Sequence, residues 1–280
     1  MGIDKLNLTI YEAPDIQYLE WSGDVKKDEY RMKHYQYFCK LDKAEVMWKP
    51  HKYSAETNLN FPYCKIDINP KYFDNFVDLY NYMMRIFGED KTIELSKFRV
   101  TRIDLASDIE GLSFDTAISR LYVLGYRRDG LSIIAGSTMY LGSNPLIRVY
   151  DKLKEIKYRV KKGHLITEYE KNILEAKKTV TRFEIAIQPK QMTLEDVVND
   201  YCGLASYFDK CRFYNFEDDE KISSLGGLQF LMSQMRREKR AAFEKYKDNQ
   251  LASLIKENYI ASVTDWFCGV KSSYFKEMPF

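Results

Sequence analysis

The sequence has few of the residues that build the common metal and disulfide sites. It holds 3 histidines and 5 cysteines in 280 residues, and the cysteines are scattered without a Cys-x-x-Cys pair. An odd number of scattered cysteines argues against both a disulfide framework and a zinc site. The three histidines stand too far apart in the sequence to form a histidine-based metal motif. Any metal that this chain binds is therefore expected to have mainly oxygen ligands.

Long apolar runs are also missing. No stretch approaches the roughly 18 apolar residues of a membrane span, and the N-terminal residues carry no apolar signal segment. The composition, with 45% hydrophobic and 30% charged residues, is that of a soluble globular protein. We therefore expect a cytoplasmic protein that makes no contact with a membrane.

Apolar periodicity predicts an α+β fold. Alternating apolar positions within residues 1–68, 98–109 and 179–187 favour strands of a mainly antiparallel sheet. Helical spacing predicts flanking helices over residues 70–87, 114–125, 153–162 and 167–178, and further helices over residues 194–207, 225–247 and 250–267. We expect the sheet and its flanking helices to form a catalytic domain over residues 1–210. A helical C-terminal region, residues 211–280, would follow it.

A predicted β-hairpin carries the most suggestive chemistry. Two β-prone runs, residues 138–141 and 146–150, are joined by Gly142-Ser-Asn-Pro145, which is rich in turn formers. Because side chains alternate along a strand, Arg148 and Tyr150 share one face, and Lys152 joins them if the strand continues. A phenol has a pKa of about 10, so it needs a nearby cation, a base or a metal to attack a phosphate at neutral pH.

Two other predicted strands carry carboxylates beside arginines on one face. The residues are Arg102, Asp104 and Asp108 in residues 98–109, and Arg182 and Glu184 in residues 179–187. If the two strands are neighbours, Asp104 and Glu184 lie close enough to hold Mg²⁺ or Mn²⁺, which prefer oxygen ligands. Asp108 is either a third ligand or a cap of the following turn. The alternative for the carboxylates is simple pairing with the arginines.

Positive charge is concentrated in two segments although the net charge is only +2. Residues 148–182 hold 11 Lys and Arg against 5 Asp and Glu, and residues 221–250 hold 7 against 3. Such clustering suits a polyanionic partner. In the predicted helix over residues 225–247, Arg236, Arg237 and Arg240 lie off the apolar stripe, where they can read the major groove of duplex DNA or form a solvated face.

Three motifs together resemble a known family. In chain order they are Arg102-Ile-Asp-Leu-Ala-Ser-Asp108, Arg148-Val-Tyr-Asp-Lys152 and Arg182-Phe-Glu-Ile185. This ordered set resembles the motifs of the Rep_trans-type rolling-circle replication initiators, a family of staphylococcal-type plasmid Rep proteins and related relaxases. The resemblance covers roughly the middle of the chain. It implies that Tyr150 is the nicking tyrosine, which becomes joined to the 5′-phosphate of the cleaved strand and leaves a 3′-OH primer.

The resemblance also implies partners. It implies a homodimer that acts on double-strand origin DNA and on single-stranded DNA at the nick, and then passes the nick to a host helicase. Within this interpretation Arg148 and Lys152 assist Tyr150, and Arg102 and Arg182 are further candidates for contacts to DNA. The alternatives are a relaxase of an integrative conjugative element, a metal-dependent nuclease that uses water, and a non-catalytic DNA-binding regulator.

Overall fold

The computed structural model describes residues 2–28, 34–51, 61–88, 90–124, 131–134, 136–216, 218–234 and 246–267. Its strands are β1 Ile3–Ile10, β2 Asp24–Lys27, β3 Tyr35–Lys40, β4 Ala44–Pro50, β5 Cys64–Ile68, β6 Arg99–Glu110, β7 Leu121–Val123, β8 Leu131–Ile134, β9 Thr138–Leu141, β10 Leu146–Asp151, β11 Val180–Ile187 and β12 Cys211–Phe213. Its α-helices are α1 Ile16–Ser22, α3 Phe76–Phe87, α4 Phe114–Arg120, α5 Lys152–Lys161, α6 Glu168–Glu175, α7 Leu194–Asn199, α8 Asp219–Ser224, α9 Gly227–Gln234 and α11 Asn249–Phe267. The 3₁₀ helices among the residues described are η1 Pro70–Tyr72, η2 Leu95–Lys97 and η4 Gly203–Lys210.

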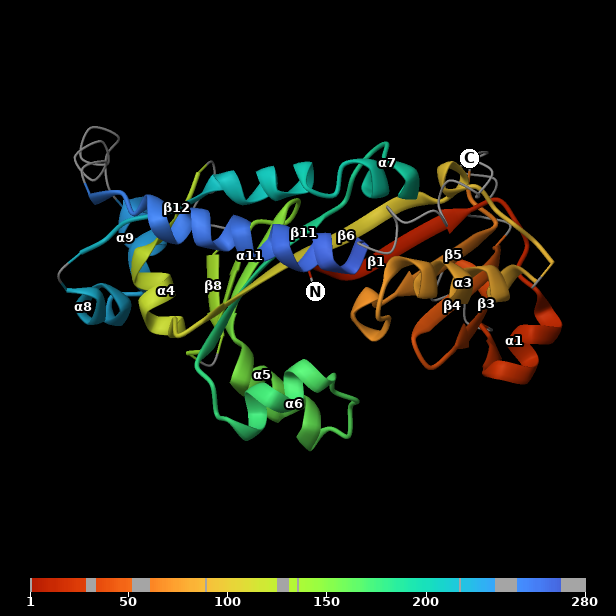
Figure 1. Cartoon of the computed structure of the whole chain (residues 1–280), viewed down its shortest axis with the longest axis horizontal. Coiled ribbons are helices and arrows are strands. Elements are labelled where there is room, and N and C mark those ends of the chain that lie inside the picture. Colours follow the sequence, from red (N-terminus) through yellow and green to blue (C-terminus); the bar gives the residue numbers. More distant parts are fainter. Residues whose placement is uncertain are drawn as a thin grey trace.

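The predicted α+β architecture is confirmed (Figure 1). Within the described residues, ten strands form one antiparallel sheet in the order β2-β3-β4-β5-β1-β6-β11-β10-β9-β8, and β7 and β12 form a small separate pair. The sequence-distant strands β6, β11 and β10 are therefore direct neighbours. None of the described helices is long and apolar enough to cross a membrane.

One face of the sheet is apolar and carries the main core. Leu6, Ile103 and Ile187 are cross-strand neighbours on β1, β6 and β11, and each is at most 4% exposed. The long helix α11 lies along this part of the sheet (Figure 1), where the Ser107 hydroxyl on β6 donates a 2.7 Å hydrogen bond to the Ile255 carbonyl. Residues 249–267, beyond the predicted boundary at residue 210, thus share one hydrophobic core with the sheet.

The other face is polar and is flanked by the helical hairpin α5–α6, which stands apart from α11 (Figure 1). A small separate core joins this hairpin to the start of β11; it is formed by Ile156, Ile173 and Val180. Asp151 at the end of β10 caps α5, because its carboxylate accepts a hydrogen bond from the Lys154 N–H. Strand β10 thereby passes into helix α5 at the residue that follows Tyr150.

Three predicted helices differ from the structure. The helix expected over residues 70–87 is divided into η1 and α3, because the Asn75 side chain caps a new helix start. The helix expected over residues 114–125 ends at Arg120, because the chain then enters β7 and pairs with β12. The helix expected over residues 194–207 becomes α7 followed by η4. The predicted β-hairpin is present as β9 and β10.

Candidate active site

The strand pairing places the predicted polar residues in two rows across one sheet face. The rows are Tyr150, Arg182 and Asp108, and Arg148, Glu184 and Ala106, each read from β10 through β11 to β6. Ala186 lies opposite Asp104 and Ala106 lies opposite Glu184, so the two carboxylates are diagonal neighbours on β6 and β11. The register therefore brings Asp104 and Glu184 together, as the sequence predicts for neighbouring strands.

A polar pocket of about 460 Å³ lies on this face. Its lining includes Lys5, Arg102, Asp104, Arg148, Tyr150 and Glu184. Asp4, Glu155 and Tyr140 also border it, so three cationic side chains, four carboxylates and two phenols surround this space. Such a pocket offers a nucleophile and cationic side chains that can contact an anionic group.

The Tyr150 hydroxyl is held by a carboxylate. It donates a 3.1 Å hydrogen bond to Glu184 Oε2 on the adjacent strand. Burial raises the pKa of Tyr150 well above its ordinary value, and the positive charge of Arg182 on β11 only partly opposes that shift. The resting phenol is therefore neutral, and the hydrogen-bonded carboxylate of Glu184 is placed to accept its proton.

Arg148 joins the two carboxylates. Its Nη2 lies 2.8 Å from Asp104 Oδ2 and also contacts Glu184 Oε1. The side chains of Asp104 and Glu184 are each only 2% exposed, so their negative charges need a partner. Arg102 supplies a second partner to Asp104 through two hydrogen bonds of 2.7 and 2.9 Å. Oxygens from both carboxylates therefore converge on one position that a guanidinium nitrogen fills.

This donor set suits a hard divalent cation. Mg²⁺ is usually bound by one or two carboxylates together with waters and substrate phosphates, rather than by a complete protein cage. Asp104 and Glu184 provide such a pair on one position. Among the described residues no group of three or more His, Cys, Asp and Glu side chains forms a fuller metal cluster.

Asp108 lies away from this pair and forms an ion pair with Arg182. The Arg182 guanidinium donates to both Asp108 oxygens at 2.6 and 2.7 Å and to Asp4 at 2.9 Å. Burial favours the neutral acids, but the charge of Arg182 holds the pKa of Asp108 and of Asp4 below their ordinary values. Arg182 is only 5% exposed, so its charge is matched inside the protein.

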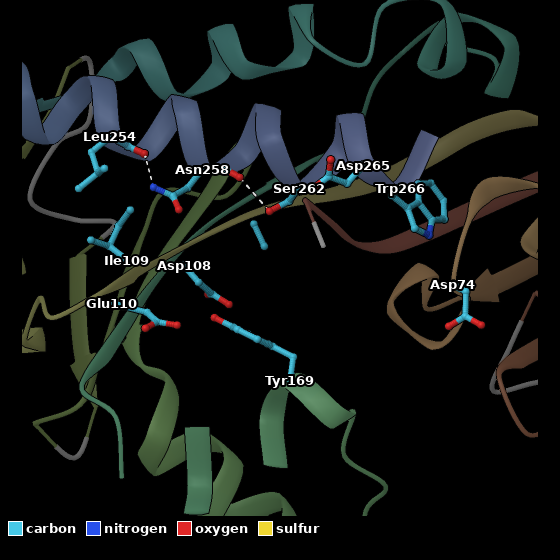
Figure 2. A pocket seen from close by; sticks show the side chains of 11 residues that line it. Asp74, Asp108, Ile109, Glu110, Tyr169, Leu254, Asn258, Ser262, Asp265 and Trp266 are labelled. Carbon is cyan, nitrogen blue, oxygen red and sulfur yellow. Dashed lines mark hydrogen bonds between the residues drawn. The ribbon is translucent and has the colours of Figure 1, made fainter. Parts of the chain in front are cut away.

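Asp108 borders a different pocket, of about 670 Å³, beside β6 (Figure 2). β1 covers that edge of β6 only as far as Ala106, whose N–H donates to the Gly2 carbonyl. Figure 2 shows Tyr169 reaching from α6 toward Asp108, while Asn258 and Ser262 hydrogen-bond to carbonyls of their own helix α11. Neither Asp104 nor Glu184 borders this pocket, so Asp108 is not brought together with the other two carboxylates.

Lys152 lies outside the tyrosine pocket. The strand does not continue through it, because Asp151 starts α5. The Lys152 ammonium is instead 1% exposed and is paired with Glu155 at 2.8 Å and Glu170 at 3.0 Å. It therefore anchors the helical hairpin and does not lie on the strand face that carries Arg148 and Tyr150.

The sequence pattern did not single out Asp4 and Lys5. In β1, Ile3 is opposite Leu105 but Lys5 is opposite Asp104, so one extra residue is inserted in β1. This bulge lets both Asp4 and Lys5 reach the polar side, where Asp4 binds Arg182 and Lys5 borders the pocket. The signal is visible in the sequence, because the apolar alternation breaks between Ile3 and Leu6.

Arg236, Arg237 and Arg240, the predicted duplex-reading residues, lie outside the described residues.

Comparisons with known proteins give no relative for this chain: no protein-family model matches it, and no curated protein or solved structure matches it significantly.

Proposed function

We propose that this protein is a DNA-nicking and religating enzyme that initiates rolling-circle replication, with Tyr150 as its nucleophile. The observation that supports this most strongly is the hydrogen bond from the Tyr150 hydroxyl to Glu184, within a pocket bordered by Arg102 and Arg148. A nucleophile that is hydrogen-bonded to a base is the usual arrangement of covalent catalysis. The three sequence motifs meet at this one place.

The reaction is a transesterification. The Tyr150 oxygen attacks the phosphorus of the scissile phosphodiester, and its proton passes to Glu184. The bond from phosphorus to the 3′-oxygen breaks, and that oxygen takes up a proton and becomes a free 3′-OH. The new phosphotyrosine ester keeps the energy of the broken bond, so the reverse attack by a 3′-OH reseals the strand without ATP.

The charged side chains around the tyrosine provide the electrostatics. Arg148, Arg102 and Lys5 border the same pocket and can donate hydrogen bonds to a phosphate that enters it. Asp104 and Glu184 would hold Mg²⁺ or Mn²⁺, which would make the phosphorus more electrophilic. Arg148 contacts both carboxylates, so it balances their charge before DNA enters.

The biological setting follows from the family resemblance. The protein would act as a homodimer on double-strand origin DNA, expose a single strand at the nick and pass it to a host helicase. A relaxase of an integrative conjugative element would use the same chemistry on a transfer origin. Both settings need the same covalent step at Tyr150.

The test is covalent trapping of DNA. The protein is incubated with Mg²⁺ or Mn²⁺ and a random-sequence pool of single strands labelled at the 3′ end, and the products are separated on a denaturing gel. We expect the label to move with the protein, because the attached fragment keeps its 3′ end. Sequencing the attached strands then gives the recognition sequence.

The other candidate functions give different products. A nuclease that uses water would release labelled fragments without any label on the protein. A non-catalytic regulator would leave every strand intact. Either result, with Tyr150→Phe giving the same products as the unmodified protein, would refute the proposal.

A further inference from the structure

Helix α5, which follows Tyr150 directly, carries a stripe of exposed basic and aromatic side chains. We call the set Lys154, Lys157, Tyr158, Lys161 and Lys162 the α5 stripe; all five residues are exposed. Their spacing of three and four residues places them on one side of the helix, opposite buried Lys152 and Ile156. Tyr158 is 62% exposed, so its ring is accessible to a ligand.

The stripe has little compensating negative charge. No acidic residue occurs between Glu155 and Glu168, and the Asp151 carboxylate is 3.8 Å from the Lys154 ammonium, beyond hydrogen-bond distance. On the neighbouring helix α6, by contrast, Lys171 pairs with Glu168 at 2.9 Å. The Lys162 ammonium lies 5.8 Å from the centre of the Tyr158 ring. Basic groups interleaved with an exposed ring are typical of surfaces that bind single-stranded nucleic acid.

Contacts between α5 and α6 hold the stripe in a fixed position beside the active site. Buried Glu170 on α6 accepts from Lys152 at 3.0 Å and from Arg159 at 2.6 Å, so both ends of α5 are fixed to α6. Ile156 and Ile173 pack between the two helices. The exposed side of α5 therefore keeps a fixed position relative to Tyr150, which lies two residues before its first turn.

The stripe also begins at the tyrosine pocket. Glu155, in the first turn of α5, borders the pocket that holds Tyr150. Tyr158 and Lys162 follow it at three and seven residues, on the same side of the helix. The ten residues of α5 extend about 15 Å from this point. A strand that leaves the pocket along α5 meets the stripe immediately.

We propose that the α5 stripe binds the single-stranded DNA next to the scissile phosphate. The lysines contact backbone phosphates, and Tyr158 stacks against one base. The proposal rests on the proposed nicking function, which places a DNA strand in the pocket. It assigns the surface to single strands because a stacked base needs an exposed face that a paired and stacked duplex does not offer.

The experiment compares two triple variants of the full chain that lose the same charge. The test variant carries Lys154→Ala, Lys157→Ala and Lys161→Ala, all in a helix that tolerates alanine. The control carries Lys26→Ala, Lys40→Ala and Lys171→Ala, which are exposed positions on β2, β3 and α6. Binding to a fluorescent oligothymidylate of about 20 nucleotides is measured by anisotropy across a salt series, since such binding tolerates any base.

We expect the test variant to bind about ten- to a hundredfold more weakly at low salt. The slope of log K against log salt should fall by about 2, because each single-strand phosphate that a lysine neutralises contributes about 0.7 to it. The control should bind like the unmodified protein. Tyr158→Leu should weaken binding about fivefold or more without changing the slope, and it should leave binding to a duplex of the same length unchanged.

Several outcomes would overturn the proposal. Equal effects of the test and control variants would show that charge alone matters, and an equal loss of duplex binding with Tyr158→Leu would show a general polyanion surface. Failure of the proposed function looks different, since the α5 stripe would still bind oligothymidylate while no covalent adduct forms. Conversely, a covalent adduct together with identical binding by the test and control variants would support Tyr150 as the nucleophile and show that the α5 stripe does not bind the strand.

Discussion

The Tyr150 hydroxyl donates a 3.1 Å hydrogen bond to Glu184 Oε2, and the two residues are diagonal neighbours on adjacent strands. Arg182, not Glu184, lies directly opposite Tyr150 in the register. The diagonal contact therefore leaves Arg182 free to bind Asp4 and Asp108 while Glu184 serves the phenol. Burial raises the pKa of Tyr150, so a base in direct contact is what this nucleophile needs.

Tyr150→Phe should abolish nicking while DNA binding remains nearly intact. Only the hydroxyl is removed, and removal of a nucleophile typically costs at least about a thousandfold in rate. Loss of one partly buried hydrogen bond should change the free energy of unfolding by only about 1 kcal/mol. Adduct yield and anisotropy are measured on the same preparation. Covalent attachment that persists in this variant would exclude Tyr150 as the nucleophile.

Glu184→Gln and Asp104→Asn should lower cleavage with little change in side-chain shape. For Glu184→Gln the loss should be about a hundred- to ten thousandfold, the usual contribution of a general base. Cleavage by the unmodified protein should stop when a chelator removes Mg²⁺ and Mn²⁺ and return when either ion is added back.

Melting curves separate a catalytic role from a structural one. Both substitutions leave Arg148 with one fewer negative partner, so both variants should melt at a lower temperature. If the carboxylates only pair with arginines, the folded fraction of each variant would cleave at the normal rate. Rates are therefore compared per folded molecule.

The buried pair of Lys152 and Glu170 should make stability depend on pH in the acid range. Burial opposes ionisation of Glu170, but the charges of Lys152 and Lys71 lower its pKa from 4.5 to about 2. The unfolded chain binds this proton more readily, so the stabilisation is complete above about pH 5 and is lost as the pH falls toward 2. Glu170→Gln should flatten the dependence of the unfolding free energy in that window.

The matched control for this measurement is Glu168→Gln on the same helix. Glu168 is 77% exposed and pairs with the exposed Lys171, so its removal should change stability little. Asp4 and Asp108 also have lowered pKa values, so some acid dependence should remain in Glu170→Gln. An undiminished slope in that variant would contradict the anchoring role of Glu170.

Replacing Arg236, Arg237 and Arg240 with alanine should weaken binding to origin duplex. The log-log salt slope should fall by about 0.9 for each duplex phosphate that these arginines neutralise. An arginine that contacts a base edge should also cost about 1 to 3 kcal/mol of discrimination between origins. Nicking of a short single strand should survive, because the proposed chemistry lies on β6, β10 and β11. Loss of single-strand cleavage with unchanged duplex affinity would instead assign these arginines to the active site or to a dimer interface.

The polar strand faces were predictable because they depend only on local alternation. Period-two patterns place Arg148 with Tyr150, and Arg182 with Glu184, whatever the sheet order. The ordering β6-β11-β10 is a long-range choice that no local pattern gives. Because of this strand order, Arg148 forms ion pairs with Asp104 and Glu184, and Arg182 forms an ion pair with Asp108. The sequence alone therefore could not distinguish, for each carboxylate, between pairing with an arginine and binding a metal.

The position of Lys152 depended on competition between a strand and a helix start. Asp151 is a favourable cap, and the following residues are good helix formers, so the helix begins two residues after Tyr150. The capping signal was present in the sequence. The Lys152 ammonium is buried against Glu170 only because α6 packs on α5. Helix α6 begins 16 residues after Lys152, so local sequence does not predict this contact.

The most direct measurement is to locate the DNA attachment on the protein. The trapped complex is digested with nuclease and trypsin, and the peptides are examined by mass spectrometry for an added nucleotide. Cleavage after Arg148 and Lys152 should release Val149-Tyr-Asp-Lys152, and we predict that this peptide carries the 5′-linked nucleotide on Tyr150. A nucleotide on any other tyrosine, or strand cleavage without any modified peptide, would contradict the account.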